Sequence, residues 1–336
     1  MDFIYKLLKL NRVIKNTQAK LLAICLARVF NVRHLSLRID PVTACNLKCR
    51  MCEVPKDTVS RIKKFSEDDR LRLGRMLFKK ALQVVIGCGY EPTMHKQFMH
   101  YVSMANDYGV PYVGITSNGQ LLTKQHIEQF IQYGLSEITI SLHGVQKKTY
   151  QRLMINASYE NLHKFLENLD AQKAKHNIKT PSLRINYTIN SDNIDELPMF
   201  FNCFGHYGID TLQIRPMYGD CYPEGKLSER DTQKYAGYLK AISTECSKKN
   251  ITLMAHTGDL NFNQDNSAAI IYPEIFYHID PNIVWRQDFA WRDETYNSYC
   301  RRIKYNKYLI KSVLSGKKTL LKRADLFPGS GRYDVF

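Results

Sequence analysis

Three closely spaced cysteines are the residues of this chain best suited to chemistry. They form the pattern Cys45-x-x-x-Cys49-x-x-Cys52, shortly after an alternating run at 35–39 that predicts a strand. Three thiolates from one short loop can hold three irons of a [4Fe–4S] cube. The fourth iron is then left without a protein ligand and can bind a small molecule.

Two other uses of the cysteines fit less well. A structural zinc site requires four closed ligands, and the sequence has no second CxxC pair and no HxxxH pair. Residues this close on one loop cannot all pair in disulfides. The spacing therefore favours an iron–sulfur cluster.

The composition indicates a globular protein of a reducing compartment. Of the 336 residues 44% are hydrophobic, and no apolar run approaches the roughly 20 residues that cross a bilayer. The longest run near the start, 21–27, is bracketed by Lys20 and Arg28 and has no cleavage site after it, so we expect no signal peptide. Nine irregularly spaced cysteines argue against a secreted disulfide framework. We expect a cytoplasmic protein.

The net charge of +16 is concentrated at the two ends. Residues 1–35 contain seven Lys or Arg and one acid, and residues 301–323 contain nine and no acid. Such blocks are often solvated faces, but they also suit an anionic membrane surface, a phosphorylated substrate or nucleic acid. The amphipathic stretches 3–10 and 301–323 predict peripheral contact with the inner face of a membrane. Nucleic acid is the less favoured partner.

Between residues 35 and 255 strand and helix signals alternate six times. Capping boxes at Ser66 and Ser228 begin two helices, and Gly109 and Gly134 end two others. The predicted strands are short apolar runs at 35–39, 82–86, 112–115, 137–141, 183–187 and 211–214. This alternation predicts a parallel sheet in an α/β fold, a partial, TIM-like (β/α)6 barrel.

Polar residues gather where these strands end. Chemistry in such barrels lies at the carboxyl ends of the strands. The second strand is followed by a turn that includes Gly89-Tyr90-Glu91-Pro92, and the third ends near Ser117 and Asn118. The fourth ends at Ser141 and His143, and Asn186 and Arg215 lie inside otherwise apolar strands.

In these features the sequence resembles the radical SAM superfamily over about residues 35–218. Members carry CxxxCxxC after the first strand, with a bulky residue before the last cysteine, a place that Met51 fills here. The resemblance implies a [4Fe–4S] cluster whose open iron binds S-adenosyl-L-methionine (SAM). It further implies a one-electron donor such as flavodoxin or ferredoxin, and a 5′-deoxyadenosyl radical that abstracts hydrogen from a substrate.

The resemblance also assigns roles around SAM. The turn 89–92 is expected to contact the methionine amino group, with Tyr90 in the place of a second glycine. Ser117 and Asn118 match the family's turn after the third strand, and Ser141 should approach the ribose or carboxylate. His143 replaces an acid and either contacts substrate or satisfies a local hydrogen bond. Arg152 lies near the SAM carboxylate or in a surface ion pair, and Asn186 and Arg215 face either the cofactor or a helix.

The segments outside the core are expected to choose the substrate. We divide the chain into a basic N-terminal extension (1–34), the core (35–256) and an aromatic-rich, then basic, C-terminal extension (257–336). Only Cys300 lies beyond Cys246, so the cysteine-rich extension of many peptide-modifying relatives is absent. Eight aromatic residues at 272–299 predict a cap on the barrel mouth or a wall of the substrate site.

Three functions remain open from the sequence. The first is a radical enzyme acting on a peptide or on a phosphorylated, sugar- or lipid-linked small molecule. The second is a tRNA-modifying radical enzyme, and the third is a non-catalytic barrel that binds a cluster.

Overall fold

One curved sheet organises the protein. The computed structural model describes residues 6–7, 10, 13–14, 16–53, 62–217, 221–256, 267–316, 320 and 334–335. Within these residues the strand order is β8-β1-β2-β3-β4-β5-β6-β7-β9. The strands are β1 (Leu35–Ile39), β2 (Ala81–Ile86), β3 (Tyr112–Ser117), β4 (Glu137–Leu142), β5 (Ser182–Ile189), β6 (Thr211–Pro216), β7 (Thr252–Ala255), β8 (Phe276–Ile279) and β9 (Asp334–Val335).

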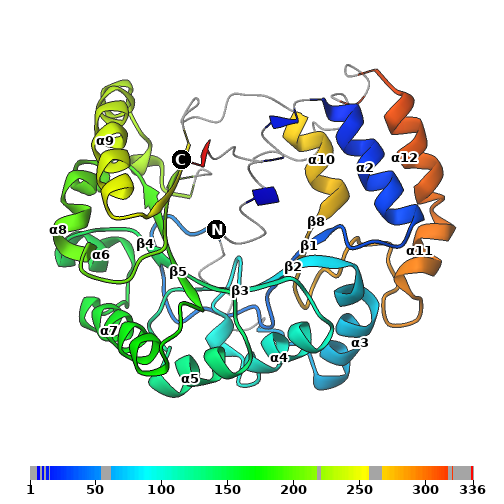
Figure 1. Ribbon diagram of the computed structural model, residues 1–336, viewed down its shortest axis with the longest axis horizontal. Coiled ribbons are helices and arrows are strands. Elements are labelled where there is room, and N and C mark those ends of the chain that lie inside the picture. Colours follow the sequence, from blue (N-terminus) through cyan, green and yellow to red (C-terminus); the bar gives the residue numbers. More distant parts are fainter. Residues whose placement is uncertain are drawn as a thin grey trace.

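The sheet is open and almost entirely parallel, which confirms the predicted partial barrel (Figure 1). All six predicted strands are present as β1 to β6. The described sheet is larger than six strands, because β7 and β8 extend it in parallel at its two ends and the two-residue β9 pairs antiparallel with β7. The strand β8 comes from the C-terminal extension and lies beside β1, in register from Ser36–Phe276 to Ile39–Ile279.

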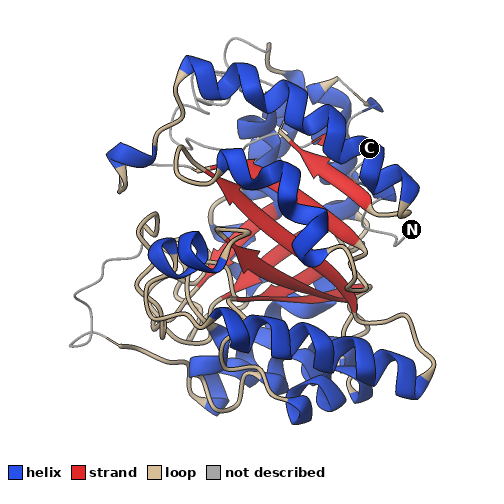
Figure 2. Cartoon of the chain, turned by 90° about the vertical axis from the view of Figure 1, so that its left-hand side faces the viewer, coloured by secondary structure: helices blue, strands red, loops and turns tan. Residues whose placement is uncertain are grey.

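Helices alternate with the strands and cover the outside of the curve (Figures 1 and 2). The predicted caps are confirmed: Ser66 and Ser228 each form a capping box, and Gly109 and Gly134 adopt positive φ after α4 and α5. The helices are α2 (Thr17–Val29), α3 (Glu67–Leu77), α4 (Met99–Asp107), α5 (Lys124–Gln132), α6 (Lys147–Leu153), α7 (Tyr159–His176), α8 (Phe200–Phe204), α9 (Glu229–Lys248), α10 (Ser267–Ile275), α11 (Tyr296–Arg302) and α12 (Tyr305–Leu314).

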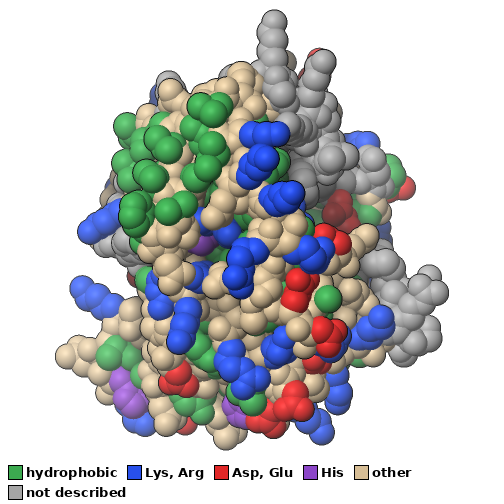
Figure 3. Space-filling model, turned by 90° about the vertical axis from the view of Figure 1, so that its right-hand side faces the viewer, with side chains coloured by type: hydrophobic (Ala, Val, Ile, Leu, Met, Phe, Trp, Pro, Cys, Tyr) green, Lys and Arg blue, Asp and Glu red, His purple; other side chains and the backbone are tan. Residues whose placement is uncertain are grey.

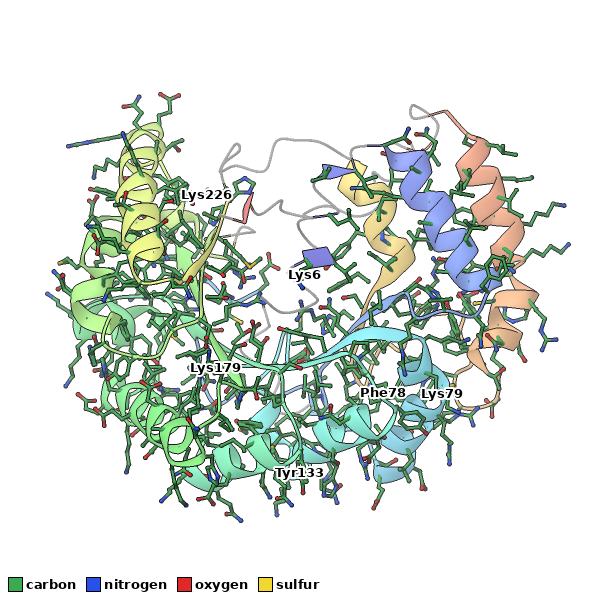
Figure 4. All side chains as sticks on the ribbon, in the orientation of Figure 1. Lys6, Phe78, Lys79, Tyr133, Lys179 and Lys226 are labelled. Carbon is green, nitrogen blue, oxygen red and sulfur yellow. The ribbon has the colours of Figure 1, made fainter. Side chains whose placement is uncertain are left out.

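The two faces of the sheet differ in chemistry because side chains alternate along each strand. The convex face is apolar and packs against the helices: Val84, Val113 and Ile138 share one core with helix residues such as Phe130. Side chains fill this outer layer, where Phe78 and Tyr133 are labelled in Figure 4. The opposite positions point into the concave side, and most of them are polar, including Arg38, Glu137 and Arg215.

The amino-terminal end of the concave face is occupied by a buried ion pair. The Arg184 guanidinium lies 2.6 Å from the Glu137 carboxylate, which also accepts a 2.6 Å hydrogen bond from the Tyr112 hydroxyl. Leu7 packs nearby against Val85 and Tyr112. Of the described apolar residues in the predicted membrane-binding stretch 3–10, Leu7 packs against the sheet and Leu10 is 52% exposed. Most of that stretch lies outside the described residues.

Six of the eight aromatic residues at 272–299 pack into the core on the convex side of the sheet. Tyr277 is in register with the core residue Leu37, and Trp285 stacks on the Tyr277 ring. Trp291 packs edge-on against Phe65, and Tyr296 packs against Trp285. For these residues a cap over the barrel mouth is wrong in position, because β8 directs Tyr277 into the core beneath α2 and α11. Phe276 instead lies on the concave face, where Arg38 lies over its ring and Tyr272 stacks on it, so the predicted wall of the substrate site stays a prediction for these two aromatic residues.

Candidate active site

The cysteine loop follows β1 at the carboxyl edge of the sheet, as predicted. Cys45 is exposed, Cys49 and Cys52 are half-buried, and none of the three forms a disulfide. The loop rests on the segment after α6, since the Lys48 and Arg50 amides donate to the Ile155 and Leu153 carbonyls at 3.1 and 2.9 Å. Backbone contacts thus fix the loop while leaving the thiols accessible.

The surroundings of Cys45 suit a metal-bound thiolate. The Leu47 amide donates to Cys45 Sγ at 3.4 Å, and Asn118 Nδ2 lies 3.9 Å from the same sulfur. Burial among protein atoms raises the pKa of the free Cys45 thiol to about 11, so a bound cation is needed to hold the thiolate. In the described part of the chain, no three His, Cys, Asp or Glu side chains are placed to bind one common metal ion. The cysteines of a four-iron cube need not be placed in that way, because each binds a separate iron.

Asp40 holds the turn after β2 in place. It lies at the end of β1, is fully buried, and accepts hydrogen bonds from the amides of Cys88 (2.8 Å), Gly89 (2.9 Å) and Tyr90 (3.4 Å). His278 Nε2 of β8 lies 2.5 Å from the same carboxylate. The Tyr90 amide therefore joins this turn despite its side chain. One carboxylate fixes three consecutive amides beside the cysteine loop.

The pairing of His278 with Asp40 predicts a pH-dependent stability. Burial lowers the pKa of His278, but Asp40 and Asp280 outweigh it and raise the pKa above its usual value. Because the pKa of His278 is raised in the folded state, its ion pair with Asp40 stabilises the protein fully below about pH 6.5. This stabilisation is lost as the pH rises through the folded-state pKa of His278. Because the imidazole is partly exposed, we expect a contribution of at most about 1 kcal/mol. Urea unfolding between pH 6 and 8.5 should show the wild type approaching His278→Gln as pH rises. A difference that stays constant with pH would contradict this.

Within the turn, the glycine that the backbone requires is Gly87 rather than Gly89. Gly87 has φ +85°, and a Cβ there would collide with the Thr116 carbonyl oxygen. A Cβ at Gly89 would make ordinary contacts of 3.4 Å with Asp40 and 3.6 Å with His278. The turn that requires glycine thus begins two positions before Gly89, the first residue of the Gly-Tyr-Glu-Pro motif.

Glu91 links three loops. Its amide donates to the Ala44 carbonyl of the cysteine loop at 3.0 Å. Its buried carboxylate accepts from Thr93, from the Ser117 hydroxyl (2.9 Å) and from the Asn118 amide (2.8 Å). Burial raises its pKa, while these donors favour the ionised form. Pro92 follows as the first residue of a 3-10 turn, Pro92–Met94. Glu91, Ser117 and Asn118 therefore form one connected unit, as the motif order suggested.

Two buried polar atoms, one directly after β4 and one on β5, have no hydrogen-bond partner. Among the described residues, Asn186 Oδ1 and His143 Nδ1 make no hydrogen bond. Ser141 is paired in register with Asn186 on neighbouring strands, and Arg215 Nε lies 3.3 Å from Thr188 Oγ1 one strand further on. Burial and the charge of Arg215 lower the pKa of His143 to about 4, so its imidazole is neutral near pH 7. Unpartnered buried atoms of this kind call for a polar ligand.

Met51 and Arg152 lie at the edge of this region. Met51 is buried against Leu153 and Tyr222. Arg152 Nη1 makes a 2.9 Å ion pair with Asp192, the second of the two roles that the sequence left open for it. The Asp192 carboxylate also accepts a hydrogen bond from Tyr222.

Asp40, His278 and Glu196 are organising residues that the sequence reasoning missed. Glu196 accepts from the Val145 amide at 2.6 Å and so holds the segment after β4. A carboxylate directly after the first strand, as at Asp40, was the available signal. The helices α9, which contains Cys246, and α11, which contains Cys300, lie at opposite ends of the sheet (Figure 1).

With this geometry, residues 39–197 match the family model described as the Radical SAM superfamily. Residues 39–197 therefore form a radical SAM domain, and the cofactors of this family are a [4Fe–4S] cluster and SAM.

Its relatives act on different substrates. The chain is 24% identical over 210 residues to a probable GTP 3′,8-cyclase of Saccharolobus solfataricus, covering 62% of this chain and 65% of that one. It is 26% identical over 180 residues to the PqqA peptide cyclase of Bradyrhizobium diazoefficiens, covering 54% and 46%. The chain thus spans less than two thirds of either relative.

Among solved structures, Streptococcus suis SuiB bound to SAM aligns with a TM-score of 0.58 at 15% identity. The alignment covers 76% of this chain and 60% of SuiB. SuiB bound to the precursor peptide SuiA aligns with a TM-score of 0.57 at 17% identity, with the same coverage. These likenesses concern the fold.

The residues present fit the family's cofactors. Three cysteines that form no disulfide, on one anchored loop, suit a cube with one open iron. The unpartnered Asn186 and His143 atoms are buried on the strands that follow it along the sheet. A polar ligand that reaches from the loop to these strands would satisfy them.

Proposed function

We propose that this chain cleaves SAM reductively to a 5′-deoxyadenosyl radical, which abstracts hydrogen from a bound substrate. Three accessible cysteines on a loop that Asp40 and Glu91 connect to the neighbouring turns carry the proposal. When bound and reduced, the cluster supplies the electron that splits SAM. Flavodoxin or ferredoxin would reduce it.

The chain's own contribution is to position SAM and shield it. Asp40 keeps the turn 88–90 facing the cysteine loop, and Glu91 keeps Asn118 beside Cys45. Ser141, Asn186 and neutral His143 offer hydrogen bonds to the nucleoside and carboxylate. We assign the contact with the methionine amino group to the turn at Gly89, Tyr90 and Glu91. The concave face limits water around the reacting carbon.

Anaerobic reconstitution with iron and sulfide tests the reaction. With dithionite and SAM, we expect 5′-deoxyadenosine to form in amounts that exceed a control without reductant at least about tenfold. If the protein holds its cluster but forms no 5′-deoxyadenosine, it is a cluster-binding barrel without catalysis, and the proposal fails.

For the substrate we propose an anionic group bound by Arg38 and Arg215. Both side chains lie on the concave face, and both charges act on the thiol of Cys88, whose pKa burial raises and these two arginines lower. No carboxylate in the described part forms an ion pair with either guanidinium. Half-buried unpaired cations favour an anion. A phosphorylated small molecule or an acidic peptide meets this need, and relatives named for GTP and for a peptide are consistent with either.

Inorganic pyrophosphate is a probe of this anion site. At concentrations about a hundredfold above its Kd, we expect it to raise the Tm of the wild type by a few degrees. Arg38→Met should abolish that rise, because one of the two cations is gone. Arg75→Met, on the exposed side of α3, is the matched control and should keep it. Equal rises in Tm in the wild type and both variants would contradict the proposed anion site without bearing on the proposed cleavage of SAM.

A further inference from the structure

The outward side of α2 is apolar. Leu21, Ile24 and Cys25 face the core, as expected of a surface helix. The opposite side carries Leu22 and Leu26, each 46% exposed, and Val29, 56% exposed, at helical spacing, and Phe30 follows at 72%. A helix normally turns polar residues to solvent. A contiguous exposed apolar stripe of this kind marks an interaction surface.

The neighbouring helix α12 extends this stripe and adds positive charge. It packs beside α2, where Arg28 Nε donates to Asn306 Oδ1 at 3.2 Å. Its exposed side carries Ile310 and Leu314 together with Lys307 and Lys311. Figure 3 shows the apolar patch with Lys and Arg side chains gathered next to it. We call this surface the α2–α12 face, defined by Leu22, Leu26, Val29, Phe30, Ile310 and Leu314 with Lys304, Lys307 and Lys311.

The charge pattern of the α2–α12 face indicates which kind of partner it binds. Residues 17–29 and 296–314 contain no Asp or Glu. If two copies met through this face, their lysine rows would face each other, and like charges across an interface are costly. An anionic bilayer instead supplies an acyl region for the apolar stripe and phosphates for the lysines. No described helix is long and apolar enough to span such a bilayer.

We propose that the α2–α12 face seats the protein on the surface of an anionic phospholipid bilayer. The apolar stripe of α2 lies in the interface, and the lysines of α12 contact lipid phosphates. This surface shares no residue with the proposed radical chemistry and goes beyond it.

Flotation of the full chain with large unilamellar vesicles tests the proposal. We expect binding to phosphatidylcholine vesicles that contain phosphatidylglycerol, weak binding to pure phosphatidylcholine, and a loss of binding as salt screens the charges. Leu22→Ser with Leu26→Ser should reduce the partition coefficient by on the order of tenfold or more, since both side chains leave the interface. Lys307→Glu with Lys311→Glu should remove the preference for the anionic lipid.

Matched controls separate this surface from general charge and hydrophobicity. Leu71→Ser on α3 and Lys240→Glu on α9 change exposed residues elsewhere and should bind like the wild type. Circular dichroism and Tm should match the wild type in each variant used. Wild-type protein that ignores anionic vesicles, or equal binding by Leu22→Ser with Leu26→Ser, overturns the proposal. So does a dimer that light scattering detects and that this double variant dissociates, because the face would then join two copies.

Discussion

Alanine at any one of Cys45, Cys49 or Cys52 will abolish the formation of 5′-deoxyadenosine and remove most of the bound iron. Each thiolate is expected to hold a different iron of the cube, so no neighbour can replace it. The loss in rate should exceed about a thousandfold, because the uncatalysed cleavage has no electron source. Iron and sulfide content, visible absorbance and product chromatography on anaerobic protein measure the effect.

Cys221→Ala provides the control for general cysteine chemistry. Cys221 is also an exposed cysteine that forms no disulfide, but it lies outside the loop. Its variant should keep full iron content and product formation. Should all three loop variants retain iron and activity, or should the bound metal be zinc, the cluster assignment is wrong.

Asp40→Ala will weaken SAM binding and destabilise the fold together. The change leaves the part-buried amides of Cys88, Gly89 and Tyr90 without their acceptor. Each unsatisfied buried amide costs about 1–3 kcal/mol, so we expect a loss of roughly 3–5 kcal/mol in the free energy of unfolding. Because the released turn is the proposed binding site of the methionine amino group, the Kd for SAM should rise at least about tenfold.

Two further variants assign the effect to the lost hydrogen bonds. Asp40→Asn retains one acceptor oxygen and should fall between wild type and Asp40→Ala in urea unfolding. Asp280→Asn removes a nearby negative charge while keeping a side-chain oxygen for its own turn, and its Kd for SAM should match that of the wild type. If Asp280→Asn weakens SAM binding as much as Asp40→Ala, the charge rather than the hydrogen bonds is responsible.

Local patterns in the sequence predicted much of the fold and part of the candidate site. The cysteine spacing, the six strand–helix units and the capping boxes at Ser66 and Ser228 depend on residues close together in the chain. Glu91, Ser117 and Asn118 were identifiable because each follows a strand whose end lies at the same edge. The roles proposed for these residues towards SAM remain predictions.

Features that depend on distant residues were not predicted. The strand β8 is four residues long and follows α10, which contains Pro273. The alternation of strand and helix signals in the sequence therefore does not predict it. Its pairing with β1 places His278 on Asp40 and turns Tyr277 into the core. The aromatic cluster was therefore expected at the barrel mouth, since its strand was not recognised. The outward apolar stripe of α2 was likewise missed, because sequence periodicity shows an amphipathic helix but not which side the protein covers.

The position of β8 also determines when the molecule can be completed during synthesis. Asp40 and His278 are 238 residues apart, so the cysteine loop leaves the ribosome long before the strand that flanks it. Contacts between such distant segments slow folding. A chain truncated before residue 276 would therefore contain every cysteine of the loop but would lack the His278 contact to Asp40.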